Sequence, residues 1–188
     1  MKKRTTRIAA AAAACCAVLV AAATWAQSSI SGLEVGSPTA SIPVLDVTGE
    51  YAGQRICYVC EFQDVPNVLA FFRETSDETA DLIRQLDELY LRHKHEDFKA
   101  VAAIVAGEEA SPWLEDLNAS AGLEIPLVVL RRGPRDVAVR LYEINPEVDN
   151  TFLVTVNRFV VDNVSDIGVG EFNRVVDATE LMLAQNTP

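Results

Sequence analysis

Two cysteines separated by two residues, Cys57 and Cys60, are the residues of this chain best suited to chemistry. Thiols at this spacing can form and break a disulfide, or they can supply half of the ligands of a metal site. Among the 188 residues there are two further cysteines, Cys15 and Cys16, which lie in an apolar run near the N-terminus. A functional interpretation therefore depends on Cys57 and Cys60.

Three interpretations of this pair stay open at the level of the sequence: a redox-active dithiol, a structural disulfide, or half of a metal site. A bridge across so short a loop constrains the unfolded chain little and would add about 2 kcal/mol or less. For a metal site, His93 and His95 are the available partners, because zinc accepts two cysteines and two histidines. Side chains two residues apart diverge on a helix, however, and the helix dipole alone explains histidines at its C-terminus.

The surroundings of the pair in the sequence do not favour a thiolate. The pair precedes a predicted buried strand and opens no predicted helix, so we expect little help from a helix N-terminus. The acidic residues Glu50, Glu61 and Asp64 oppose a thiolate, and Arg55 is the lone nearby cation. We nevertheless take the pair as the candidate catalytic site, with no metal and no cofactor.

A second group of candidate binding residues lies far from the cysteines in the sequence. Arg131, Arg132 and Arg135 flank the turn at Gly133–Pro134 and could hold an anion. A solvated turn is the simpler interpretation. The carboxylates of the chain are too numerous and too scattered to nominate a catalytic pair.

The N-terminal residues are typical of an export signal. Basic residues at positions 2–7 precede an uncharged apolar run, and Thr24–Trp25–Ala26 offers a small-x-small cleavage site. We expect residues 1–26 to be removed and the protein to be periplasmic or extracellular. The alternative is a retained anchor, for which the run of about 16 residues is short compared with the roughly 20 of a bilayer span. In an oxidising compartment the cysteine pair would rest as a disulfide.

Charge limits the classes of partner. The chain has 16 basic and 27 acidic residues and a net charge of −11. Removal of the predicted signal takes four basic residues and leaves 12 basic against 27 acidic, or −15. Such a charge argues against binding to nucleic acid or to an anionic membrane surface. A protein thiol or disulfide is the expected partner, and the sequence indicates no oligomeric state.

From residue 43 onward, predicted strands and helices alternate. Apolar runs predict strands at 43–47, 68–72, 100–105 and 126–130, and a hairpin of 152–156 and 159–162 that turns at 157–158. Helical spacing predicts a helix capped by Ser76 and ending near His95, and two more at 111–121 and about 170–184. Residues 136–144 fit either type. Residues 27–42 are small and polar and predict a flexible lead-in, which leaves 43–188 as one domain.

Three segments resemble motifs of the thioredoxin-like superfamily, closest to its redoxin and peroxiredoxin branch. Residues 68–79 (VLAFFRETSDET) resemble the strand that leads into the active-site helix. In this placement Ser76 and Thr79 stand where the family has its two cysteines, and no peroxiredoxin-type attacking cysteine is present. The resemblance therefore implies no peroxidase activity. Ser76 is interpreted as a helix cap and not as a nucleophile.

The other two segments flank this one in the sequence. Residues 150–163 (NTFLVTVNRFVVDN) resemble the strand pair after the family's cis-proline, whose position is held by Asp149 or Asn150. Residues 42–54 (IPVLDVTGEYAGQ) resemble the first redoxin strand and turn. A subset of exported redoxin-like proteins carries Cys-Tyr-x-Cys in the loop that follows, and this chain is similar to them.

The resemblance implies an α/β protein of thioredoxin-like fold, with a central mixed sheet flanked by helices. It implies a thiol-disulfide oxidoreductase in which Cys57 or Cys60 attacks a partner's disulfide and the other cysteine resolves the mixed disulfide. Because the family's usual cysteines and proline are both replaced, the alternative is a non-catalytic binding or structural module with a structural disulfide.

Overall fold

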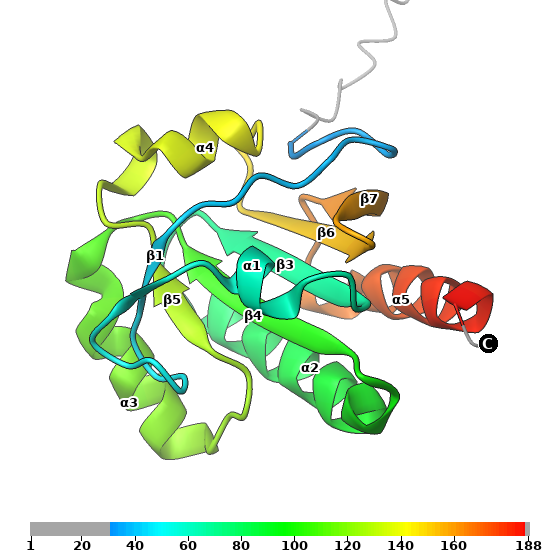
Figure 1. The fold of residues 1–188 in the computed structure, drawn as a ribbon. Coiled ribbons are helices and arrows are strands. Elements are labelled where there is room, and N and C mark those ends of the chain that lie inside the picture. The colour runs from blue at the N-terminus through cyan, green and yellow to red at the C-terminus, as the bar shows by residue number, and fades with distance from the viewer. Residues whose placement is uncertain (1–30, 187–188) are drawn as a thin grey trace, which may run out of the picture.

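The computed structural model describes residues 31–186, in which seven strands form one mixed sheet in the order β2-β1-β5-β4-β3-β6-β7 (Figure 1). The strands are β1 (Val44–Asp46), β2 (Arg55–Ile56), β3 (Asn67–Phe72), β4 (Lys99–Ile104), β5 (Leu127–Val129), β6 (Asn150–Val156) and β7 (Phe159–Ser165). β3, β4 and β5 are parallel, and the remaining pairings are antiparallel. The predicted signal, residues 1–26, lies outside the described residues.

Five α-helices cover the two faces of this sheet. They are α1 (Tyr58–Phe62), α2 (Asp77–His93), α3 (Ser111–Ala121), α4 (Val137–Leu141) and α5 (Asn173–Asn186). α2, α3 and α5 pack on one face, and α1, α4 and residues 31–42 pack on the other. None of the helices in residues 31–186 combines the length and apolar character needed to cross a bilayer.

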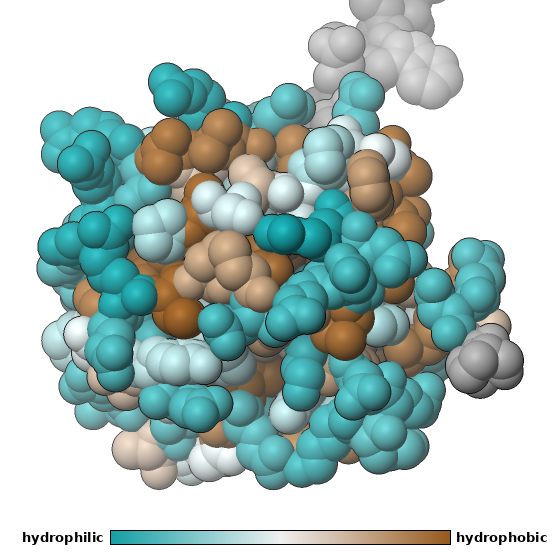
Figure 2. All heavy atoms as spheres, in the orientation of Figure 1, coloured by the Kyte–Doolittle hydropathy of each residue, from teal (hydrophilic) through white to brown (hydrophobic). Residues whose placement is uncertain are grey.

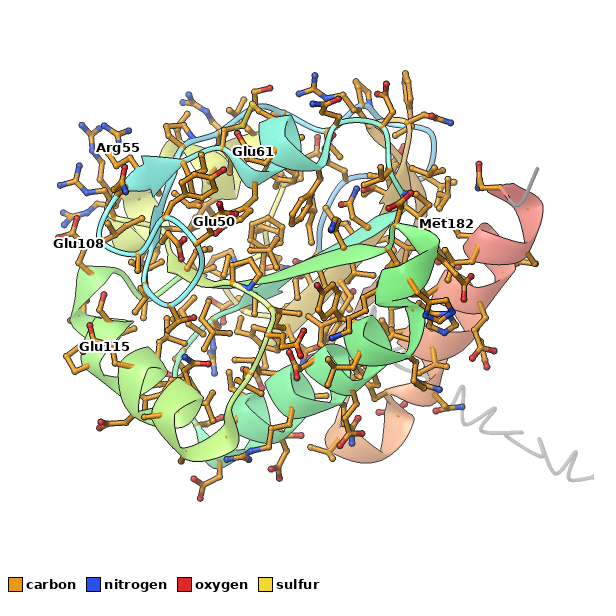
Figure 3. The ribbon with its side chains drawn as sticks, turned by 60° about the horizontal axis from the view of Figure 1, so that its bottom comes forward. Glu50, Arg55, Glu61, Glu108, Glu115 and Met182 are labelled. Atoms are coloured by element: carbon orange, nitrogen blue, oxygen red, sulfur yellow. A yellow bond between two sulfur atoms is a disulfide. The ribbon has the colours of Figure 1, made fainter. Side chains whose placement is uncertain are left out.

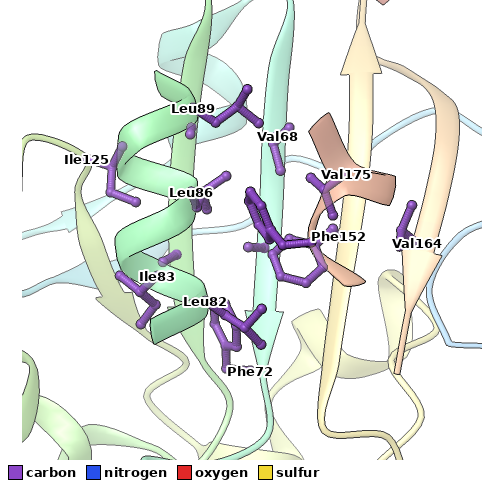
Figure 4. Packing of buried hydrophobic residues seen from close by; sticks show 14 of the residues in the cluster. Val68, Phe72, Leu82, Ile83, Leu86, Leu89, Ile125, Phe152, Val164 and Val175 are labelled. Atoms are coloured by element: carbon purple, nitrogen blue, oxygen red, sulfur yellow. The ribbon is translucent and has the colours of Figure 1, made fainter. Parts of the chain in front are cut away.

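Side chains that alternate along the central strands contribute to the hydrophobic cores on both faces of the sheet. On β3, Val68 and Phe72 face the side of α2, while Leu69 and Phe71 face the side of α1. Figure 4 shows how the apolar residues of α2 meet this sheet and Phe152 of β6. The sequence therefore reads as continuous apolar runs here because these strands are buried on both faces.

Most predicted elements are present, and two short ones were missed. The structure confirms the helix capped by Ser76 and the hairpin, whose turn residues Asn157 and Arg158 have positive φ angles of 53° and 65°. The ambiguous residues 136–144 contain α4. β2 and α1 were not predicted, since two and five residues carry too little periodicity to be recognised.

Residues 31–42 differ from the flexible lead-in that their composition predicted. The Ser31 hydroxyl is hydrogen-bonded to that of Thr151 on β6 at 2.6 Å, and the Gly36 N–H donates to the Val160 carbonyl at 2.7 Å. Leu33 is buried with the core on the α1 side. Small residues allow the backbone to lie close to the sheet, so this composition also suits a tightly packed segment.

Candidate functional site

Cys57 and Cys60 form a disulfide at the start of α1. Their Cα atoms are 5.2 Å apart, and Cys57 is the N-cap residue of the helix. The Cys60 N–H donates to Cys57 Sγ at 3.2 Å and to the Cys57 carbonyl at 2.9 Å, so sulfur shares this capping donor with the backbone. Cys60 is exposed and Cys57 is half-buried. The expectation that no helix N-terminus lies near the pair was wrong, because the pair itself opens a helix too short to be recognised in the sequence.

Buried residues of α1 hold the disulfide on the sheet. Tyr58 and Val59, the two residues between the cysteines, are both buried, as is Phe62 at the end of the helix. The rings of Tyr58 and Phe62 lie 5.5 Å apart. Cys60 therefore lies on the outer side of the helical turn, while the half-buried Cys57 packs against the core on its inner side.

A buried carboxylate ties α1 to the neighbouring strand. Asp46, fully buried in β1, accepts a hydrogen bond from the Tyr58 hydroxyl at 2.7 Å and from the N–H groups of Gly49 and Tyr51 at 2.8 and 2.9 Å. A Cβ at Gly49 would lie 2.7 Å from Asp46 Oδ2, so this turn requires glycine. This network could not be predicted from the sequence, since its members are single polar residues without a motif.

The surroundings of Tyr58 and Tyr51 raise the pKa of both hydroxyl groups. Burial raises the pKa of Tyr58, and the hydrogen bond to Asp46 raises it further, so the hydroxyl stays a donor at any physiological pH. The hydrogen bond from Tyr51 to Glu61 and the charge of Glu61 also raise the pKa of Tyr51. Glu50 and Glu61 lie near α1 and its preceding loop (Figure 3). The pair thus has acidic neighbours, as the sequence predicted.

The end of β3 and the start of α2 form a separate polar pocket. Ser76 Oγ accepts the Thr79 N–H at 3.0 Å, and the Thr79 hydroxyl donates to the Glu74 carbonyl at 3.0 Å. A cavity of about 340 Å³ opens here, and Arg73 at its edge pairs with Asp149 at 2.6 Å. The two hydroxyl side chains serve the helix cap, which agrees with the interpretation of Ser76 as a cap.

Comparisons with known proteins identify the architecture. No family model matches the chain, and no curated protein matches its sequence. Many solved structures do match. Peroxidoxin BcpB from Mycobacterium tuberculosis superposes with a TM-score of 0.63 at 14% identity, over 83% of this chain and 99% of its own.

Two other solved structures agree with this match. Peroxiredoxin Q from Xanthomonas campestris gives a TM-score of 0.62 at 14% identity, over 81% of this chain and 98% of its own. The thioredoxin domain of a thiol-disulfide oxidoreductase from Bacteroides vulgatus gives 0.59 at 12%, over 77% and 96%. The chain has a thioredoxin-like fold. At 12–14% identity the likeness establishes the fold alone.

Asn150, one of the two residues predicted to stand at the proline position of the thioredoxin-like pattern, makes hydrogen bonds of its own. Every peptide bond in residues 31–186 is trans. The buried Asn150 side chain donates to the Ile167 carbonyl at 2.8 Å and accepts the Ile167 N–H at 3.1 Å. This amide fixes the segment after β7 against β6, a bond that proline has no polar side chain to make.

The histidines considered for a metal site lie elsewhere. His93 pairs with Glu96 at 3.1 Å, and the exposed His95 lines a hollow with Asp64 and neighbouring residues before β3. The hollow brings His95 next to the segment before β3, but neither cysteine lines it. Within the part of the chain that the structure describes, no cluster of three or more histidine, cysteine or acidic residues could hold a metal ion.

The structure adds one residue to the predicted arginine group. Arg131 and Arg132 line a hollow of about 360 Å³ together with Arg55, the cation that immediately precedes the cysteine segment. Arg131 pairs with Glu108, and Figure 3 shows Arg55 and Glu108 at one corner of the molecule. Sequence reasoning treated the two arginine sites separately because they are far apart in the chain.

Proposed function

We propose that this protein is an exported thiol-disulfide oxidoreductase that works through Cys57 and Cys60. The observation that supports this most is the hydrogen bond from the Cys60 N–H to Cys57 Sγ. Once the bridge opens, this donor stabilises a thiolate on Cys57. The exposure of Cys60 gives a partner thiol a place to attack.

The reaction proceeds by two thiol-disulfide exchanges. A thiolate of the partner attacks Cys60 Sγ, the Cys57–Cys60 bond breaks, and Cys57 leaves as a thiolate that keeps the hydrogen bond from the Cys60 N–H. The partner's second thiolate then attacks the partner sulfur of the mixed disulfide and releases Cys60. Two electrons pass from the partner's dithiol to the pair, and the protons of the two partner thiols balance those taken up by the two cysteines. In reverse, the pair reduces a partner disulfide without any cofactor.

Export is part of the proposal and rests on the sequence of residues 1–26. An oxidising compartment would return the pair to its disulfide form between reactions. N-terminal sequencing of the exported protein tests this, and we expect the mature chain to begin near Gln27. An intact Met1 on membrane-bound material would contradict cleavage.

The reduction potential of the pair tests the proposed activity. We expect equilibration with glutathione or dithiothreitol to give a potential above about −300 mV, the range of exchangeable bridges. A potential well below that value, with no exchange toward a dithiol peptide, would overturn the proposal. A Cys57→Ser variant should accumulate mixed disulfides on Cys60, because the resolving thiol is gone, and Cys60→Ser should accumulate fewer. We expect the reduced protein to consume peroxide no faster than free thiols.

The alternative is a non-catalytic binding module with a structural disulfide. The cavity of about 340 Å³ beside Arg73 and Asp149 favours it, because a polar pocket stands where the family motifs place chemistry and no cysteine lines it. In that case the potential would be low, and replacing both cysteines would leave ligand binding at this pocket unchanged.

A further inference from the structure

Five arginines line one continuous groove on a protein that is otherwise acidic. The groove consists of two hollows of about 360 and 750 Å³ that share Arg132, Asp136 and Val137. Its arginines come from β2, from the turn after β5 and from α4, and they are Arg55, Arg131, Arg132, Arg135 and Arg140. This set is called the arginine groove below. Three separate parts of the chain therefore contribute guanidinium groups to one surface.

The charges of the arginine groove are largely unpaired. Arg131 forms a salt bridge with Glu108, whereas the other four arginines form none with any carboxylate in residues 31–186. Most arginines elsewhere in the described chain are paired, as Arg84 is with Asp81 and Arg174 with Glu171. In a chain with 27 acidic residues, leaving four guanidinium groups together without partners points to a partner from outside.

The acidic residues of the groove do not neutralise it. Asp136 caps α4: one carboxylate oxygen accepts the Ala138 N–H at 3.1 Å, and the other accepts the Arg132 N–H at 3.2 Å. Glu143 lines only the second hollow and forms no salt bridge in the described residues. The groove therefore keeps a net positive charge and free guanidinium donors.

Exposed aliphatic side chains accompany the arginines. Val137 in the groove is 45% exposed, and Leu141 on the same helix is 43% exposed. Figure 2 shows hydrophobic side chains over α4 next to hydrophilic ones. A free inorganic anion would use only the charges. A peptide that carries both carboxylates and an aliphatic residue would use both features of the groove.

We propose that the arginine groove binds an acidic segment of a partner protein, in which aspartate or glutamate residues flank an aliphatic residue. A nucleic acid or an anionic membrane would face the whole acidic surface of the protein and be repelled by it. A short peptide segment interacts only with nearby charges, because salt screens charges more than about 8–10 Å away. Arg55 lies two residues before Cys57, so at most about 7 Å of chain separates groove and disulfide. Delivery of the segment's thiols to Cys57–Cys60 rests on the proposed function; the binding itself does not.

A labelled peptide of about twelve residues, with four glutamates around one leucine, tests the binding by fluorescence anisotropy with the full protein. We expect Arg132→Gln with Arg135→Gln to weaken binding about tenfold, since each loses a charge-assisted contact. The matched control, Arg84→Gln with Arg174→Gln, removes the same charge from α2 and α5 and should change the affinity less than about twofold.

Equal losses of affinity in both variants, or tighter binding to anionic vesicles than to the peptide, would overturn the proposal. The proposal would also be overturned if the parent protein self-associates and only the Arg132→Gln/Arg135→Gln variant does not. The arginine groove would then bind a second copy of this chain.

The same peptide separates this proposal from the oxidoreductase proposal. Cys57→Ser with Cys60→Ser should bind it with unchanged affinity. A second peptide with two cysteines after the acidic residues should be oxidised by the parent faster than a lysine-containing counterpart, and the Arg132→Gln/Arg135→Gln variant should lose this preference. Binding without any exchange would contradict only the proposed function. Exchange without any preference for the acidic peptide would contradict only the groove.

Discussion

Two helices of this protein begin alike but with different capping atoms. α2 follows Ser76, whose Oγ accepts the Thr79 N–H at 3.0 Å, and α1 follows Cys57, whose Sγ accepts the Cys60 N–H at 3.2 Å. α2 has 17 residues and α1 has five, so α2 has the stronger dipole. The capping atom, and not the strength of the helix, therefore decides which of these two sites can perform thiol chemistry.

The surroundings of the two helix starts differ as well. The start of α2 opens into a polar cavity where Arg73 is neutralised by Glu74 and Asp149. The start of α1 lies over a buried Tyr58–Asp46 pair and follows Arg55, which forms no salt bridge within residues 31–186. Two helix starts of this fold thus carry polar side chains with different surroundings, and the cysteines lie at the one that follows Arg55.

Removing both sulfurs from α1 should produce the largest effect. Cys57→Ser with Cys60→Ser is expected to abolish exchange and to lower the melting temperature by only a few degrees, because so short a loop adds little chain entropy. A dithiol-oxidation assay and a thermal melt measure the two effects. Retained exchange would show that the chemistry lies elsewhere, and a variant that does not fold would make the bridge structural.

Asp46→Ala should have the next largest effect, on the free energy of unfolding and on the reduction potential of the cysteine pair. It leaves the Tyr58 hydroxyl and two backbone N–H groups without their acceptor, which we expect to lower the free energy of unfolding by about 3 kcal/mol and to alter the potential of the pair. Asp87→Ala is the control, since the buried Asp87 accepts the N–H groups of Glu124 and Ile125 far from α1. Urea unfolding should show similar losses, with the potential shifted only for Asp46→Ala. If the reduction potential shifts in both variants, Asp46 has no specific effect on the cysteines.

Alkaline pH should lower the free energy of unfolding through two buried tyrosines. Burial raises the pKa of Tyr58 and of Tyr142 above the value near 10 of an unfolded tyrosine. The unfolded chain loses these protons first, so their stabilisation is complete below about pH 10 and declines above it, by up to about 1.4 kcal/mol per pH unit for each group. Tyr58→Phe should reduce this slope in urea unfolding between about pH 9 and 11. An unchanged slope would mean that Tyr58 ionises equally in both states.

Ser76→Ala should have the smallest effect. Loss of the oxygen cap is expected to cost about 1 kcal/mol of stability and to leave exchange at Cys57 and Cys60 unchanged. Ser76→Thr, which keeps an oxygen acceptor, is the matched variant and should recover most of the loss. A fall in exchange rate on Ser76→Ala would assign the start of α2 a function beyond capping.

Local patterns made much of the fold predictable. The apolar run at 68–72 and the cap at Ser76 are continuous in sequence, and each identifies its element without knowledge of the rest. α1 was missed because it forms through burial of Tyr58 and Phe62 on a sheet whose strands lie far along the chain. Tertiary packing, and not propensity, produces this helix.

The candidate site was predictable in its residues but not in its setting. The spacing of Cys57 and Cys60 identified the pair, but the hydrogen bond between them depends on α1 and could not be foreseen. Arg55 and Arg132 share a hollow only because β2 lies at the edge of the sheet beyond β1 and β5. No one-dimensional pattern brings these two arginines together.

Residues 36–39 also cover part of the exposed edge of β7, where another copy of the chain could otherwise pair. Gly36 and Ser37 exchange backbone hydrogen bonds with Val160, and Thr39 donates to the Arg158 carbonyl, so this segment occupies the outer side of β7 where the strand begins. An uncovered strand at the border of a sheet presents a row of free donors and acceptors to any other chain. Trimming the protein to residue 43 would expose this border, including the half-exposed Phe159, to edge-to-edge aggregation.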